Sequence, residues 1–373
     1  AQEVPANASL AKGYAAFLLD SAMTSLSFTV TVTGLDFTGS QTPDPGDDLL
    51  FLSGARHPNN QNDFASGTTF NSIEFRGGGG PGYNISGNSI ALNAGLRVEN
   101  NSGVPIDHIV NNSLILNSNQ TFTVINDVGI LILAGPINLS GKDLAFNVSA
   151  GSEAQVQAVI SGAAGLIKTN AGLLTLYSNN TYTGITMLNG GTLQINGSQP
   201  ASPVLLNLGT LKGKGTVGTI TATGSGGPGT IVLSPGGSPG ILTCSNLALN
   251  ASTTLSIELN GTTVGTGYDQ LRVNGSMALG DATLAVTLGF TPAIGSAFTI
   301  VRNDGGNAVT GTFSGLPQGA TFLAGSSQFQ INSAGGDGND VVLTRIVTLE
   351  IEQVSSDAVR LLWLTNGAAG FTL

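Results

Sequence analysis

The sequence predicts an all-β protein folded as a parallel β-helix (a β-solenoid), with short β-rich segments at its N- and C-terminal ends. Short β-branched and aliphatic runs alternate with Gly, Asn, Ser and Pro turns, and helical periodicity is almost absent. The run at residues 25–32, SLSFTVTV, alternates with period two, as a half-buried strand does. Similar predicted strands cover residues 68–75, 113–116, 122–125, 129–133, 173–177, 192–195, 230–233, 254–259, 282–288 and 340–344.

Two features favour a solenoid over a sandwich or a barrel. The chain is weakly self-similar: residues 84–92, 138–146 and 274–279 each read as a polar turn followed by a strand. The apolar positions are mostly Ile, Leu and Val. Stacked coils favour aliphatic side chains of similar size in columns, with Asn and Ser at the corners. Each coil then buries its inward face only against its neighbours.

The charge composition argues against nucleic acid and anionic membranes as partners. Only 9% of the residues are charged, with 12 basic and 22 acidic residues and a net charge of −10, whereas ordinary domains have about 25% charged residues. The basic residues stand singly along the chain, apart from Lys212 and Lys214. Binding to a phosphate backbone or to anionic lipids requires a basic patch, which this pattern does not provide.

Neither a membrane span nor an internal disulfide is expected. No segment reaches the roughly 18 to 20 apolar residues that a spanning helix needs, and the longest apolar run, residues 128–134, has the length of a strand. Cys244 is the single cysteine, so a disulfide within the chain is impossible. We expect Cys244 to be a small buried apolar residue rather than a reactive thiol.

Residues 161–197 carry a long ordered motif. The segment reads SGAAGLIKTNAGLLTLYSNNTYTG and closes with GGTL at residues 190–193. It resembles the autotransporter-associated β-strand repeat of bacterial surface proteins, in which a lysine, an L-T-L strand, N-T-Y-T-G and a final G-G-T-L follow in that order. Lys168, Thr175 and residues 180–184 stand in register with this pattern, and Asn170 replaces one glycine. The resemblance implies a parallel β-helix.

Weaker resemblances extend this assignment and define three regions. Residues 68–73 resemble the entry strand of such proteins. Four later stretches resemble the later part of autotransporter passengers: residues 209–218, 234–240, 268–271 and 311–313. We therefore assign the β-helix to residues 50–345. Residues 1–49 resemble the first part of a CHRD domain followed by a linker. Residues 346–373 resemble the opening strands of a fibronectin-III-like domain.

Candidate catalytic residues are few, and we do not expect an enzyme. His57 and His108 are the two histidines, and we expect both in solvated turns. Polysaccharide lyases and hydrolases also use parallel β-helices, and they need grouped carboxylates or a bound Ca²⁺ with basic residues on one face. The sequence has one Asp-Asp pair, Asp47 and Asp48, in a linker rich in Pro and Gly. Polysaccharide cleavage is therefore the least favoured of the functions considered.

Three short motifs match known sites by chance. Residues 213–218 satisfy G-x-G-x-x-G, but a predicted strand follows them and no helix N-terminus is available for a phosphate. Residues 236–240 satisfy G-x-S-x-G, but Pro239 and the next strand exclude a nucleophile elbow. Residues 335–342 match a single Ca²⁺-binding nonapeptide, so Asp337 and Asp340 are weak calcium candidates. We expect a tight turn there and no cofactor.

The sequence favours a structural protein outside the cell, at or beyond the cell surface. Both ends resemble incomplete β-domains, and incomplete sheets expose edges. The chain is therefore its own predicted partner: strand addition would join copies head to tail into a filament. The predicted assembly residues are Val4, Phe17, Phe28, Val30, Leu349, Ile351 and Trp363. The alternative is a monomeric adhesin or display module that binds glycans or a cell surface.

Overall fold

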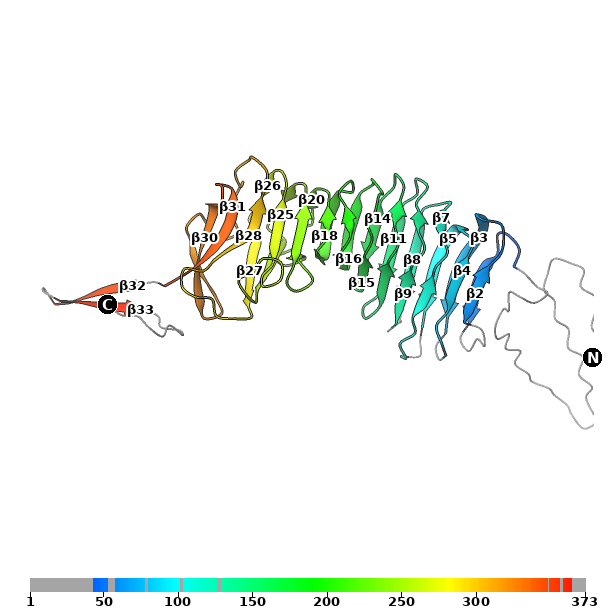
Figure 1. Ribbon diagram of the computed structural model, residues 1–373, viewed down its shortest axis with the longest axis horizontal. Helices are drawn as coiled ribbons and strands as arrows, with labels where there is room; N and C mark the ends of the chain where they lie inside the picture. Colours follow the sequence, from blue (N-terminus) through cyan, green and yellow to red (C-terminus); the bar gives the residue numbers. More distant parts are fainter. Residues whose placement is uncertain are drawn as a thin grey trace, which may run out of the picture.

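The computed structural model describes residues 43–52, 58–77, 80–100, 103–125, 129–347, 349–355 and 358–363. All regular elements in these ranges are β-strands, and most of them wind into a parallel β-helix, which Figure 1 shows as an elongated stack of coils. The predicted fold class is therefore confirmed. The described residues contain no helix long and apolar enough to cross a membrane.

Each coil adds strands to three faces, which we name in the order of the pairing ladders. The first face contains β1 (Asp48–Leu52), β3 (Thr68–Arg76), β5 (Ile90–Glu99), β8 (Gln120–Ile125), β11 (Leu144–Val148), β14 (Leu166–Thr169), β16 (Thr186–Ile195), β18 (Val204–Gly213), β20 (Ile220–Ala222), β23 (Leu247–Ala248) and β26 (Met277–Ala278).

The second face contains β2 (Asn59–Asn62), β4 (Asn84–Gly87), β6 (His108–Val110), β9 (Ile130–Leu133), β12 (Glu153–Val156), β15 (Leu173–Leu176), the later parts of β16 and β18, β21 (Ile231–Pro235), β24 (Thr253–Leu259) and β27 (Thr283–Leu288). The third face contains the starts of β3 and β5, then β7 (Leu114–Leu116), β10 (Ile137–Asn138), β13 (Ile160–Ser161), β17 (Ser198–Gln199), β19 (Thr216–Val217), β22 (Ile241–Cys244), β25 (Gln270–Val273) and β28 (Ala297–Asn303).

The core is a set of aliphatic columns that run through the coils. Because side chains alternate across a strand, every second residue points inward, and the parallel register stacks these residues on one another. In the second face an unbroken column of leucines follows the ladder, and its members are almost fully buried: Leu174, Leu193, Leu211, Leu233 and Leu255. Burial of each such side chain contributes roughly 1.5–3 kcal/mol.

The coils narrow through the repeat as far as β20 and widen after it. On the first face the ladder pairs Phe146 with Lys168, then Leu188, Leu206 and Ala222 in turn, and each step along the chain is shorter than the one before. The narrow coils hold few rings: between Phe146 and Tyr268 the only aromatic residues are Tyr177 and Tyr182. A small cross-section leaves room for aliphatic side chains but little room for aromatic rings.

The C-terminal end of the β-helix is covered by antiparallel strands. β28 pairs with β31 (Asp340–Ile346), which pairs with β30 (Ser327–Gly335), and β30 pairs with β29 (Thr321–Ala324). Phe298, Phe313 and Phe329 are fully buried there. A separate hairpin follows, formed by β32 (Leu349–Ser355) and β33 (Ala358–Trp363), and Figure 1 shows it beyond this end of the rod.

The predicted boundaries between the three regions stay predictions. The predicted N-terminal region lies almost wholly outside the described residues, as does the strand predicted at 25–32. Of the C-terminal region, the structure describes the hairpin β32–β33 but not residues 364–373.

A matched pair of leucines tests the inward and outward assignment. Leu206 is fully buried, whereas Leu208, in the same strand, is 48% exposed. We expect L206A to lower the free energy of unfolding by about 2–5 kcal/mol, because it leaves a cavity in the column. The control L208A should change it by less than about 0.5 kcal/mol. Urea unfolding followed by circular dichroism measures both, and equal effects would contradict the register.

Candidate functional site

The repeat binds its neighbouring coils through the side chain and backbone of Asn180. The Asn180 Oδ1 atom accepts a hydrogen bond from the Ile160 N–H at 2.9 Å, in the preceding coil. Its own N–H donates to the Ser198 carbonyl at 2.7 Å, in the following coil. One asparagine therefore joins three successive coils at a place where the chain forms no regular strand. This explains why the motif has asparagine at this position.

A buried hydroxyl network lies next to this asparagine, on the third side of the coil. The Tyr182 hydroxyl and the Thr186 Oγ1 atom are 2.6 Å apart, and Thr186 Oγ1 lies 2.8 Å from Ser202 Oγ. Gln199 donates to Thr186, and Ser202 donates to the Gly184 carbonyl. Burial raises the pKa of Tyr182 to about 12, so these groups remain neutral. Their role is to hold the coil together, because buried polar groups need hydrogen-bond partners.

The glycines of the motif stand where two coils approach too closely for a side chain. A Cβ atom on Gly184 would lie 2.2 Å from the Ala164 carbonyl carbon. A Cβ atom on Gly191, which also has φ +66°, would lie 2.3 Å from the Asn170 oxygen. Neither position has space for a side chain, and Gly191 also has a backbone conformation that favours glycine.

Lys168 places an ammonium group inside the corner of the repeat coil. The side chain is 1% exposed and stacks in the first-face column between Phe146 and Leu188. Its Nζ atom donates to the carbonyls of Thr169 and Asn170 at 2.8 Å and to that of Gly190 at 3.3 Å. Burial lowers the pKa of Lys168 to about 8. The lysine therefore satisfies corner carbonyls that the strand ladders leave unpaired.

A second corner is closed by Asp269, and sequence reasoning missed it. Its Oδ1 atom accepts from the Gly240 N–H at 2.8 Å, and its Oδ2 atom accepts from the Glu258 N–H at 2.9 Å. The carboxyl is almost fully buried, and burial raises its pKa to about 6 despite the two N–H donors. Two stretches that resemble autotransporter passengers, residues 234–240 and 268–271, thus meet at this carboxyl.

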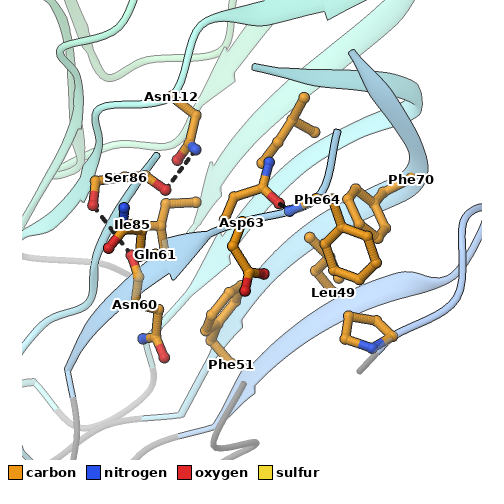
Figure 2. A pocket seen from close by; sticks show the side chains of 13 residues that line it. Leu49, Phe51, Asn60, Gln61, Asp63, Phe64, Phe70, Ile85, Ser86 and Asn112 are labelled. Carbon is orange, nitrogen blue, oxygen red and sulfur yellow. Dashed lines mark hydrogen bonds between the residues drawn. The ribbon is translucent and has the colours of Figure 1, made fainter. Parts of the chain in front are cut away.

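The first coil ends in a cleft of about 390 Å³ that is open to solvent. Figure 2 shows Leu49, Phe64 and Phe70 on one side and the polar β2 residues on the other. The ring centroids of Phe64 and Phe70 are 5.4 Å apart in an edge-to-face contact. Asn60 pairs with Ile85 and so takes the place of an aliphatic residue in an inward column. The cleft is therefore mainly apolar, with polar β2 side chains along one side.

The structure corrects one of the two histidine predictions. His108 does not lie in a solvated turn: it is 5% exposed in β6 and stacks on Phe75 with centroids 4.6 Å apart. Its Nδ1 atom accepts from the Tyr83 N–H at 3.2 Å. Burial lowers the pKa of His108 to about 4, although Asp107 opposes the shift, so the ring is a neutral core residue. His57 lies outside the described residues.

The calcium candidates lie in a turn whose polar atoms already bind the backbone. Asp340 accepts from the Asn303 N–H at 2.9 Å, and Asn339 donates to the Gly305 carbonyl at 2.6 Å. Asp337 is exposed. No group of three or more His, Cys, Asp or Glu residues in the described ranges is placed to hold a metal ion. Calcium binding by Asp337 and Asp340 stays a prediction.

The other two sequence motifs are followed by strands, as the sequence indicates. The glycine motif at residues 213–218 leads into β20, and the G-x-S-x-G motif lies between β21 and β22. Ser238 donates to Glu258 Oε2 at 2.6 Å. Cys244 is fully buried, as predicted, and burial raises the pKa of its thiol to about 12.

The predicted assembly residues fall into two groups. Val4, Phe17, Phe28 and Val30 lie outside the described residues. Leu349, Ile351 and Trp363 belong to the C-terminal hairpin, where Leu349 pairs with Trp363 and Ile351 with Leu361. Assembly through either group stays a prediction.

The similarity to known proteins covers a short part of the chain. Residues 166–195 match the family model Passenger-associated-transport-repeat. Two relatives from Serratia marcescens, each named extracellular serine protease, are 51% and 44% identical to this chain over 63 residues. Each match covers 17% of this chain and 6% of the relative. The chain therefore spans about 6% of the length of the curated relatives it matches.

The coil geometry and these matches together define an autotransporter passenger-like β-helix. Within it, residues 166–195 match the passenger-associated transport repeat, which confirms the resemblance of residues 161–197. The CHRD-like and fibronectin-III-like resemblances stay predictions.

The pH dependence of stability tests the buried lysine. Since the pKa of Lys168 falls to about 8 in the folded chain from 10.5, the folded state binds fewer protons than the unfolded state between these values. Stability should therefore rise from pH 8 towards pH 10. The variant K168M keeps the apolar stem and should lack this rise. Urea midpoints at pH 7.5, 8.5 and 9.5 measure the difference, and parallel profiles would contradict the assignment.

The opposite slope is expected from Asp269 at acid pH. Its pKa rises from 3.8 to about 6 on folding, so the folded state binds more protons in that interval. The stability contributed by this carboxyl is therefore present below pH 4 and is lost as the pH rises through 6. D269N should remove this slope and cost about 1–3 kcal/mol, because one N–H loses its acceptor. Thermal unfolding at pH 4, 5 and 6 tests this, and a wild-type slope retained in D269N would sink the idea.

Proposed function

We propose that this chain is a secreted structural element of a bacterial cell surface. In this role a passenger-type β-helix acts as a stiff spacer that holds the segments at its two ends apart. The observation that carries the proposal is the continuous parallel ladder from β1 to β27 around the passenger-associated repeat. The word "extracellular" in the names of both relatives supports the location outside the cell.

The proposed role is mechanical and not catalytic. The buried ionisable side chains Lys168 and Asp269 both bind backbone atoms of neighbouring corners. The serine protease activity in the relatives' names belongs to proteins of which this chain matches only 6%, and the proposal does not transfer it.

Binding of glycans is the alternative, and it would favour exposed aromatic rings on one face. Among the described aromatic residues, Tyr177 stands out as exposed, at 45%, while Phe64, Phe290 and Phe322 are partly buried. A single ring makes a weak sugar platform, so the spacer is the better-supported function.

Filament formation is the more specific form of the proposal, and it needs two complementary ends. The first coil offers an apolar cleft. At the other end β28–β31 cover the last coil, so the hairpin β32–β33 would have to provide the second surface. Head-to-tail growth through these two ends would produce an extracellular filament or matrix.

Electron microscopy and surface labelling test the proposal. With strands about 4.8 Å apart, negative stain of the purified chain should show rods on the order of 50 Å long or longer. Uniform filaments would support head-to-tail assembly, single rods would contradict it and leave the spacer, and round particles would contradict both. Antibodies should label intact cells of the producing bacterium, and labelling only after permeabilisation would exclude a surface location.

A further inference from the structure

The outward side of the first face is apolar in four successive coils. The ladder stacks Ala145 on Ile167, Ile167 on Met187, and Met187 on Leu205. All four are partly exposed, whereas the next residue of each strand points into the core and is almost fully buried. We call these four side chains the outward apolar patch. Figure 1 shows its strands β11, β14, β16 and β18 in the middle of the rod.

The composition of the patch differs from that of the neighbouring face in the same coils. On the second face β16 and β18 place polar residues outward, namely Thr192, Gln194, Thr210 and Lys212. A sheet with one solvated face alternates apolar and polar residues, whereas a sheet covered on both sides is apolar throughout. Residues 204–206, Val-Leu-Leu, form such a continuous run. The first face of these coils therefore has the composition of a sheet that is covered from outside.

The surroundings of the patch are polar but uncharged. A column of amides and hydroxyls runs beside it: Asn147 pairs with Thr169, and Asn207 donates to Asn189 Oδ1 at 2.7 Å. The outward positions of β8, β11, β14 and β20, and of the first-face parts of β16 and β18, carry no charge. The chain has a net charge of −10, so copies repel each other. An uncharged area is where two copies meet at the lowest electrostatic cost.

We propose that this side of the first face binds the same side of a second copy, with the two rods lying antiparallel and side by side. A second copy repeats its columns at the same spacing of about 4.8 Å, so the side chains of the two faces can interdigitate. A two-fold axis that lies in the contact plane, across the rods, keeps each column opposite its own copy. Apolar residues then meet apolar residues, and amides meet amides.

The size of the area fits a weak dimer. From β8 to β20 the first face extends about 24 Å along the rod, and five residues of a strand extend about 17 Å across it. The contact is therefore on the order of 400–500 Å² per copy, near the lower limit for a specific interface. We expect dimers that dissociate on dilution. The inference goes beyond the proposed spacer role and uses neither end of the rod, so it is independent of head-to-tail growth.

Sedimentation velocity of the full chain over a range of concentrations tests the proposal. M187K/L205K places two lysines on adjacent strands of the patch, and the control T192K/T210K places two on the same strands on the second face. Both variants lower the net negative charge equally. We expect the association constant to fall about tenfold or more in M187K/L205K and to stay within about twofold of wild type in the control. Equal losses in the two variants would overturn the proposal.

A spin label tests the arrangement without altering the patch. In a C244S background, T123C carries a nitroxide on the outward side of β8, at the edge of the area. Since packed sheets lie about 10 Å apart, the labels of an antiparallel pair should be about 20–35 Å apart by pulsed electron paramagnetic resonance. Head-to-tail neighbours would separate them by a rod length, on the order of 50 Å or longer, and that distance alone would overturn the side-by-side contact.

Two further outcomes would also overturn the proposal. The first is a chain that remains monomeric up to about 0.2 mM, well above a micromolar dissociation constant. The second is a monomer that floats with phosphatidylcholine vesicles unless it carries M187K/L205K, which would assign the patch to a lipid surface. Round particles by microscopy would remove the spacer proposal, whereas rods that do not pair would remove only this inference.

Discussion

The structure depends on one constraint: successive coils must stack in strict parallel register at the spacing of a β-ladder. A coil has no core of its own and buries its inward residues only against the coils on either side. The leucine column from Leu174 to Leu255 exists because successive coils keep this register. The same spacing brings corner backbones so close that Gly184 and Gly191 cannot carry a side chain. The spacing between coils therefore determines both the packing of the core and the need for glycine at the corners.

The constraint also explains where the few buried charges lie. Strands satisfy their backbone groups through the ladder, but at corners the chain turns and some N–H and C=O groups lose their partners. Lys168 supplies a donor to three such carbonyls, and Asp269 supplies acceptors to two N–H groups. Their pKa values shift in opposite directions for the same reason, since burial disfavours either charge. These side chains secure coil geometry, which is the kind of function a spacer requires.

The fold could be predicted from sequence because alternation and turn residues are local signals. The predicted strands at 254–259 and 282–288 correspond closely to β24 and β27. The contacts of Lys168 with Gly190 and of Asp269 with Gly240 could not be predicted, because each of these partners lies a whole coil away along the chain. First-face steps range from the short one between Leu206 and Ala222 to the long one between Leu247 and Met277, so counting along the chain does not give the register. The prediction of a solvated turn for His108 was wrong for this reason, because the stacking of coils and not the local sequence places Phe75 against it.

The ends of the rod decide whether stacking stops or continues. At the C-terminal end the chain changes from parallel to antiparallel pairing after β28, and buried rings close the column. At the first coil the column ends instead in a cleft that is apolar on one side and amide-lined on the other. The proposed head-to-tail growth would require a contact between unlike ends, because two identical ends that meet form a two-fold contact that closes on itself.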